Sequence, residues 1–148
     1  MNKFSVVLLS FLAFAGCSGT RPDLGIHNGS LMPCPKTPNC VNSQTDGEKH
    51  YVEPIRFMGT QQKARDRLLQ VLESEQQAKV FEIREDYIRT EFTSVLFRFI
   101  DDVEFYFPET QSGEILIHIR SASRLGHFDF GVNQKRVEQI RKRLNENP

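Results

Sequence analysis

Residues 115–133, ILIHIRSASRLGHFDFGVN, constrain the fold most, because a strand, a polar loop and the start of a helix follow one another there. Alternate residues from 115 to 119 are isoleucine, which is the two-residue period of a strand with one buried face. A loop with two glycines follows, and Asn133 is expected to cap the next helix. The rest of the chain must supply sheet partners for this strand.

Residues 103–107 are the nearest candidate partner, since a loop containing Pro108 and Gly113 separates them from the strand at 115–119. We expect an antiparallel hairpin in which the large apolar side chains share one face, which defines a register. The expected pairs are Val103 with Ile119, Phe105 with Ile117, Phe107 with Ile115, Asp102 with Arg120, Glu104 with His118, and Tyr106 with Leu116.

Four other segments carry patterns of their own. An edge strand is expected at 51–57, because Pro54 lacks a ladder donor, and a helix is expected from a Thr60 cap to about Gln77. The apolar run 95–100 is expected to continue a strand or to cross it with a bulge. A second hairpin, at 79–94 with its turn at Glu85 and Asp86, is expected to pair Ile83 with Ile88, Phe81 with Thr90, and Glu82 with Arg89.

The last helix is expected at 134–144. These elements predict a single α+β domain of order β-α-β-β-β-β-α. Each helix has a single apolar stripe and the strands alternate, so we expect both helices on one face of an antiparallel sheet. A length of 148 residues with 39% hydrophobic content suits one core.

The first seventeen residues are typical of a bacterial lipoprotein signal. Lys3 is followed by an apolar run at 4–14 that is shorter than the ~20 residues needed to span a bilayer, and small residues precede Cys17. We expect residues 1–16 to be removed and Cys17 to receive fatty acyl chains such as palmitate. The alternative is an ordinary signal peptide that happens to end at a cysteine. The residue after Cys17 is Ser18 and not aspartate, which by resemblance to lipoprotein sorting rules implies the outer membrane.

The segment after Cys17 is rich in Gly, Pro, Asn, Ser and Thr, which predicts irregular structure. We assign residues 17–31 to a tether and residues 32–146 to the folded domain.

Cys34 and Cys40 enclose a short loop with two prolines, and in an oxidising periplasm they are expected to form a structural disulfide. Two alternatives stay open. One is a metal site with His27 or His50, whose spacing is poor for zinc, and the other is a redox-active pair.

The loop after the central strand carries the densest group of polar residues. An anion is the expected ligand there, because exposed backbone N–H groups and a helix N-terminus favour negative charge. In the structural alternative, Arg120 pairs with Asp102 and Arg124 with Asp129. The candidate ligand site consists of Arg120, Ser121, Ser123, Arg124, His127, Asp129 and Asn133.

A hydrolase is the second hypothesis, with Asp102 or Glu104 and His118 as general acid and base. Ser121 and Ser123 lack the glycine pattern of a nucleophile elbow, and a carboxylate and a histidine across a hairpin are more often a surface pair. We therefore assign no catalytic residue, no metal and no cofactor. A lipid-binding cavity between the sheet and the helices is a third hypothesis.

Three strings, PCPKTPNCVNSQ, DDVEF and IRSASRLGHFDFGVNQKRVEQIR, resemble the motifs of a bacterial and plastid family, domain-of-unknown-function family fourteen ninety-nine. The resemblance covers residues 32–144. The family has no established catalytic residues, so the resemblance implies the domain and its bounds without a mechanism.

These observations predict a lipid-anchored envelope protein that faces the periplasm and acts as a binding or structural module rather than an enzyme. Its expected partners are the membrane, an envelope protein or a small anion. Basic and acidic residues balance at 19 each, which argues against nucleic acid.

Overall fold

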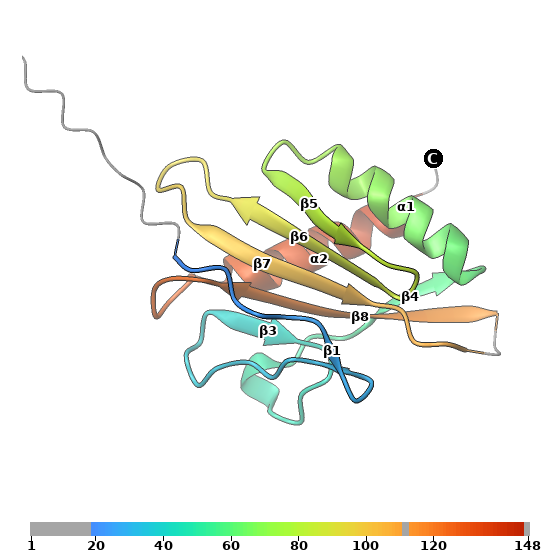
Figure 1. The fold of residues 1–148 in the computed structure, drawn as a ribbon, viewed down its shortest axis with the longest axis horizontal. Helices are drawn as coiled ribbons and strands as arrows, with labels where there is room; N and C mark the ends of the chain where they lie inside the picture. The colour runs from blue at the N-terminus through green and yellow to red at the C-terminus, as the bar shows by residue number, and fades with distance from the viewer. Residues whose placement is uncertain (1–18, 111–112, 147–148) are drawn as a thin grey trace, which may run out of the picture.

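The computed structural model describes residues 19–110 and 113–146 (Figure 1). The expected signal peptide and Cys17 lie outside these residues. The elements are β1 (Ile26–His27), β2 (Ser30–Leu31), β3 (Cys40–Asn42), the 3-10 helix η1 (Glu48–His50), β4 (Ile55–Met58), α1 (Gln61–Glu73), β5 (Ala78–Ile83), β6 (Tyr87–Thr93), β7 (Ile100–Tyr106), β8 (Glu114–Ser123) and α2 (Val132–Asn145).

The main sheet has six antiparallel strands in the order β3-β8-β7-β6-β5, and β4 pairs with the first half of β8. From β4 to α2 the chain follows the predicted order β-α-β-β-β-β-α, and the predicted α+β class is confirmed. The predicted edge strand begins only after Pro54. A separate two-stranded sheet, β1 with β2, was not expected from the sequence.

The pairing of β7 with β8 differs from the expected register by two residues. Val103 lies opposite Ser121, and Glu104 lies opposite Arg120 instead of His118. A shift of two residues preserves the alternation of faces, so the apolar pattern cannot distinguish the two registers. The expected pairing of Asp102 with Arg120 is therefore wrong, although the two strands and their buried face are as predicted.

The hairpin of β5 and β6 contains a β-bulge. Val80, rather than Phe81, lies opposite Thr90, so that predicted pair is wrong because a bulge adds one unpaired residue. The predicted pairs that are present are Ile83 with Ile88 and Glu82 with Arg89.

Residues 95–99 form neither a continued strand nor a crossing, which corrects the expectation for 95–100; Ile100 is the first residue of β7. A short loop at 94–99 joins β6 to β7, closed by the N–H of Ser94 donating to the carbonyl of Phe99 at 2.8 Å. The N–H of Phe99 in turn donates to Ser94 Oγ at 2.9 Å. The apolar side chains of this loop point into solvent.

Both helices contribute to one core with a single face of the sheet, as predicted. Thr60 Oγ1 accepts the N–H of Lys63 at 3.2 Å and caps α1, as expected. The helix residues in this core are Ala64, Leu68, Val71, Leu72, Val137, Ile140 and Leu144. No helix in the described ranges has both the length and the apolarity to cross a membrane.

The other face of the sheet is crossed by the N-terminal segment, residues 19–33, which is the blue ribbon in front of the strands in Figure 1. Leu31 is 4% exposed, and the carbonyl of Pro22 accepts a hydrogen bond from Arg89 at 3.1 Å. The guanidinium of Arg21 lies 3.9 Å from the ring centroid of Phe81. The stretch assigned to a tether from composition therefore contacts the sheet through Arg21 and Pro22.

Candidate functional site

The face beneath residues 19–33 carries charged side chains from three neighbouring strands. Each of these side chains is at most 10% exposed. We call them the charge network: Arg89 and Glu91 on β6, Asp102 and Glu104 on β7, Arg120 on β8, and Arg124 just after β8.

Asp102 lies at the centre of the charge network. Its Oδ1 accepts from Arg89 at 2.9 Å and from Arg124 at 2.8 Å, and its Oδ2 accepts from Arg124 Nε at 2.7 Å. Arg124 also donates to Glu91 at 2.5 Å, and Arg21 reaches the same carboxylate at 2.7 Å. The hydrogen bond to Asp102 raises the pKa of Arg124. Burial acts to raise the pKa of Glu91, but hydrogen bonds from Arg21 and Arg124 lower it overall, so this carboxylate stays ionised.

Glu104 occupies a second, more deeply buried part of the charge network. Its Oε1 accepts from the hydroxyl of Tyr87 at 2.8 Å, and its Oε2 accepts from Arg120 Nη1 at 3.2 Å. Burial raises the pKa of Glu104, and the opposing charge of Arg120 is too weak to reverse this. Burial also raises the pKa of Tyr87, so its hydroxyl remains a donor to the carboxylate.

Both ion pairs of the structural alternative are wrong. Arg120 binds Glu104 instead of Asp102, because the register of β7 and β8 is shifted by two residues. Arg124 reaches back over the sheet to Asp102 instead of forward to Asp129. Arg124 is therefore a buried member of the charge network, with its side chain 5% exposed.

Asp129 caps α2. Its Oδ1 accepts the N–H of Gly131 at 3.1 Å, and its Oδ2 accepts the N–H of Asn133 at 2.9 Å. Gly131, with a φ of 76°, is the residue before the first turn, and this angle favours glycine. Asn133, expected as the cap, lies inside the first turn, so that expectation is wrong and the capping carboxylate comes from Asp129.

Asn133 is fully buried where α2 meets β8 and the segment before β3. Its Oδ1 accepts from Ser121 Oγ at 2.5 Å and from Arg136 Nη1 at 2.7 Å. Its Nδ2 donates to the carbonyl of Asn39 at 3.1 Å and to Ser123 Oγ at 3.0 Å. These bonds hold three segments together, and we call this group the helix junction.

The residues of the expected anion site are thus divided. Arg120 and Arg124 lie in the charge network, and the two serines lie with Asp129 and Asn133 around the helix junction. His127 is exposed, with its ring 4.7 Å from that of Phe128. The Nε atoms of Arg89 and Arg120 are buried and have no hydrogen-bond partner among the described residues.

His118 lies opposite Tyr106, with the ring centroids 6.1 Å apart, and not opposite Glu104 as expected. Its Nδ1 is 3.2 Å from Ser43 Oγ, and burial lowers its pKa. The carboxylates of Asp102 and Glu104 are bound by arginines. The geometry therefore gives little support to an acid–base pair of His118 with either carboxylate.

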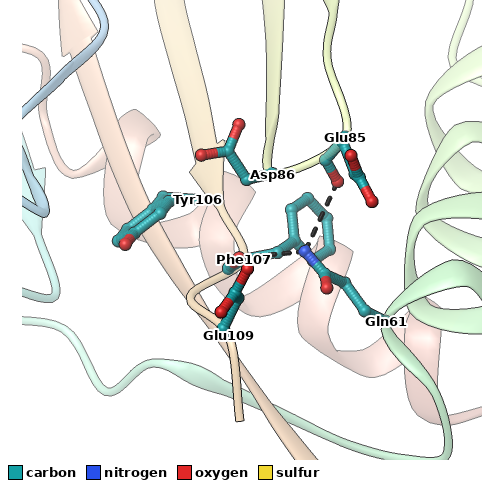
Figure 2. Close-up of a pocket in the computed structure, with 6 residues that line it drawn as sticks. All are labelled: Gln61, Glu85, Asp86, Tyr106, Phe107 and Glu109. Atoms are coloured by element: carbon teal, nitrogen blue, oxygen red, sulfur yellow. Dashed lines mark hydrogen bonds between the residues drawn. The ribbon is translucent and has the colours of Figure 1, made fainter.

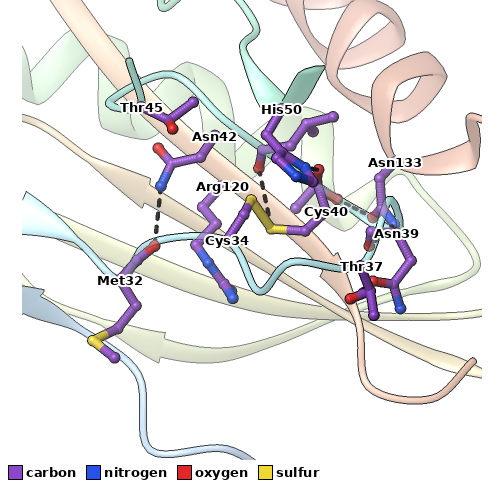
Figure 3. Close-up of a disulfide and its surroundings, with 12 residues drawn as sticks. Met32, Cys34, Thr37, Asn39, Cys40, Asn42, Thr45, His50, Arg120 and Asn133 are labelled. Carbon is purple, nitrogen blue, oxygen red and sulfur yellow. Dashed lines mark hydrogen bonds between the residues drawn. A yellow bond between two sulfur atoms is a disulfide. The ribbon is translucent and has the colours of Figure 1, made fainter. Parts of the chain in front are cut away.

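Cys34 and Cys40 form the predicted disulfide, with their Cα atoms 5.7 Å apart. Figure 3 shows the bond beside His50, whose Nδ1 lies 2.9 Å from the carbonyl oxygen of Cys40. Because both sulfur atoms are in the bond, the alternative metal site loses its thiolate ligands. The described residues contain no cluster of His, Cys, Asp and Glu suited to a metal ion.

A hollow of about 580 Å³ lies near the start of α1 and the turn between β5 and β6. Figure 2 shows the carboxylates of Glu85, Asp86 and Glu109 around it, while Gln61 donates to the carbonyl of Phe107 at 3.1 Å. None of the residues expected at a site lines this hollow, and carboxylates alone do not define a ligand.

Residues 30–144 match the family described as "Protein of unknown function (DUF1499)". The chain belongs to the DUF1499 family. A comparison with curated proteins found no match. The three strings that resemble the family's motifs converge in this DUF1499 protein: Asn39 comes from the first, Asp102 from the second, and Arg124 and Asn133 from the third. The third string therefore contacts each of the other two in the fold.

Several members of these clusters were not identified from the sequence. Arg89 and Glu91 lie in a strand that is buried on both faces, so no alternation marks them. The feature that could have identified them is charge, because they occupy alternate positions on one strand, as Asp102 and Glu104 do on another. Arg136 was not identified either; it lies on α2, and its guanidinium donates to Asp101 at 2.6 Å.

Proposed function

We propose that this DUF1499 protein is a lipoprotein of the bacterial envelope, attached through acyl chains on Cys17 and facing the periplasm, where it acts as a non-catalytic module. The observation that carries the proposal is the Cys34–Cys40 disulfide in a domain that directly follows a lipoprotein-like signal. Disulfides persist in oxidising compartments, which agrees with export. Ser18 favours the outer membrane as the site of attachment.

A non-catalytic role is supported by the pairing of the buried charges with one another. The carboxylates of Asp102, Glu91 and Glu104 each accept bonds from arginines inside the protein. Removing one partner of a buried ion pair is costly because the other charge is left uncompensated. The charge network therefore suits the attachment of residues 19–33 to the sheet better than acid–base chemistry or the capture of a small anion.

Acylation can be tested by growing cells with a labelled palmitate analogue. Wild-type protein is expected to carry the label, and Cys17→Ser is expected to lose it. The matched control is the double variant Cys34→Ser with Cys40→Ser, which keeps Cys17 and should keep the label. An unlabelled wild-type protein, or a label that persists in Cys17→Ser, would contradict the proposal.

Attachment can be tested separately by fractionation. Fully processed Cys17→Ser is expected in the soluble periplasmic fraction, because lipid chains on one residue are a sufficient anchor. Membrane retention of that processed variant would show that another part of the protein holds it there.

A further inference from the structure

Two loops at one end of the sheet expose a group of large apolar side chains. The loop at 94–99 joins β6 to β7, and the loop at 124–131 joins β8 to α2. We call the group the apolar end: Val95, Leu96, Phe97, Phe99, Leu125, Phe128, Phe130 and Val132, with exposed fractions of 76, 79, 65, 46, 37, 67, 92 and 46%.

The two loops leave the sheet side by side. Asp101 lies opposite Ser123, and the N–H of Arg124 donates to the carbonyl of Ile100 at 3.0 Å. Figure 1 shows both loops at the left end of the sheet. The apolar side chains therefore gather at one end of the molecule, and a gathering of exposed apolar groups marks a contact surface.

The fold displays these side chains instead of burying them. Phe130 is 92% exposed and has a φ of 54°, a left-handed angle that is uncommon for a bulky residue. Its neighbours hold it there, since Asp129 and Gly131 form the cap of α2. Phe97 and Phe99 stack with their ring centroids 5.7 Å apart on the neighbouring loop.

The chain enters the domain at this same end. A Cβ atom built on Gly19 would lie 3.3 Å from Arg124 Cβ and 3.3 Å from the side chain of Leu125, so the backbone of Gly19 is packed on the apolar end. Cys17 is two residues earlier, and consecutive Cα atoms are about 3.8 Å apart. The residue that would carry the acyl chains is therefore within about 8 Å of Gly19.

We propose that the apolar end lies in the surface of the phospholipid bilayer and fixes the orientation of the domain on the membrane. The inference rests on the proposed acylation of Cys17. An anchor at that distance keeps this end of the domain at the bilayer. Burial of phenylalanine and leucine side chains at the boundary of head groups and acyl chains then strengthens membrane binding. Because only one residue separates Cys17 from Gly19, the apolar end also has a high effective concentration at that surface.

The charges of the two loops fit a phospholipid surface. Arg98 is exposed among the apolar side chains of the first loop, and cations are attracted to anionic head groups. The carboxylate in the second loop, Asp129, is engaged with the N–H groups of Gly131 and Asn133. Neither loop presents an exposed carboxylate to the membrane.

Tryptophan fluorescence can test this contact, because the sequence contains no tryptophan. Phe97→Trp and Phe130→Trp each place one reporter in one loop of the apolar end. Met58→Trp is the matched control: Met58 is 76% exposed, and it pairs opposite Glu114 at the other end of the ten-residue β8. Each full-length variant is purified in its mature form and reconstituted in phosphatidylethanolamine and phosphatidylglycerol vesicles, with or without bromine on the acyl chains.

Both loop variants are expected to show blue-shifted emission and several-fold stronger quenching by brominated lipid than Met58→Trp. Equal quenching of all three, in protein that is acylated and bound to vesicles, would overturn the inference. A blue shift without quenching would also overturn it and assign the apolar end to protein contact. A mature protein whose mass lacks the acyl chains would instead overturn the proposed function, and the inference with it.

Discussion

Arg124 links carboxylates on two different strands, Glu91 of β6 and Asp102 of β7, with its side chain 5% exposed. Arg124→Ala would leave both carboxylates short of a partner under the N-terminal segment. Breaking a buried ion pair typically costs ~3 to 5 kcal/mol, a large share of a total stability of ~5 to 15 kcal/mol. We therefore expect a marked fall in melting temperature, measured by thermal unfolding of purified protein.

The matched control is Arg56→Ala. Arg56 pairs with Glu114, but the two side chains are 62% and 37% exposed, and such pairs typically contribute ~0 to 1 kcal/mol. Arg124→Lys is expected to recover only part of the loss, since lysine cannot reproduce the bidentate contact with Asp102. Equal melting temperatures for Arg124→Ala and Arg56→Ala would show that the charge network adds little stability.

His118 gives the protein a pH dependence of its own. Burial lowers its pKa in the folded state below the ordinary value of about 6.5, so the unfolded chain binds the proton more readily. Stability should therefore fall as the pH drops below about 6.5, and the loss should be complete below the folded pKa. His118→Gln is expected to flatten this part of the curve, as measured by melting temperature against pH.

Glu91 affects the stability of the protein over a separate, more acidic pH range. Hydrogen bonds from arginines lower its pKa despite burial, so its contribution is present above the unfolded pKa and is lost as the pH falls through the folded pKa. The fall in melting temperature below about pH 4 should consequently still be seen in His118→Gln. Equal slopes for wild type and His118→Gln above that pH range would argue against the buried histidine.

At the scale of elements, the disulfide holds the segment that leads into β3. Cys40 is the first residue of β3, and Asn39 just before it accepts from Asn133 through its carbonyl. Replacing both Cys34 and Cys40 with serine is expected to reduce stability by about 2 kcal/mol, the value typical of so short a loop. The measurement is denaturant unfolding of the variant beside wild type, with a thiol assay that should detect no free Cys34 or Cys40 in the wild-type protein.

The long elements were predictable from the sequence because their patterns are physical consequences of burial. The stripe Ala64, Leu68, Val71 and Leu72 has helical spacing and is the buried face of α1. The register of β7 and β8 was not predictable, because a two-residue slip keeps every side chain on its face. The strands β1, β2 and β3 have two or three residues each, too few to show a period.

At the scale of the whole molecule, the sheet has two different interiors. One face packs against the helices through apolar side chains. The other carries paired charges, and residues 19–33 run across it (Figure 1). The sequence indicated the first but not the second, because charged residues in strands ordinarily face water. Arg120 and Arg124 stand out in the sequence, but their ion-pair partners could not be identified there because they come from other strands.

The N-terminal segment has a mechanical consequence. If Cys17 is held in a membrane, any tension between the membrane and the domain is applied first at Gly19 and Arg21. The bonds of Arg21 to Glu91 and of Arg89 to Pro22 would then be loaded one after another, as when a strip is peeled from a surface. Peeling would admit water to Glu91 and Asp102 while the helix-covered core stayed intact. The domain would thus yield gradually to a pull on its anchor, by hydration of its charged face, before its core came under load.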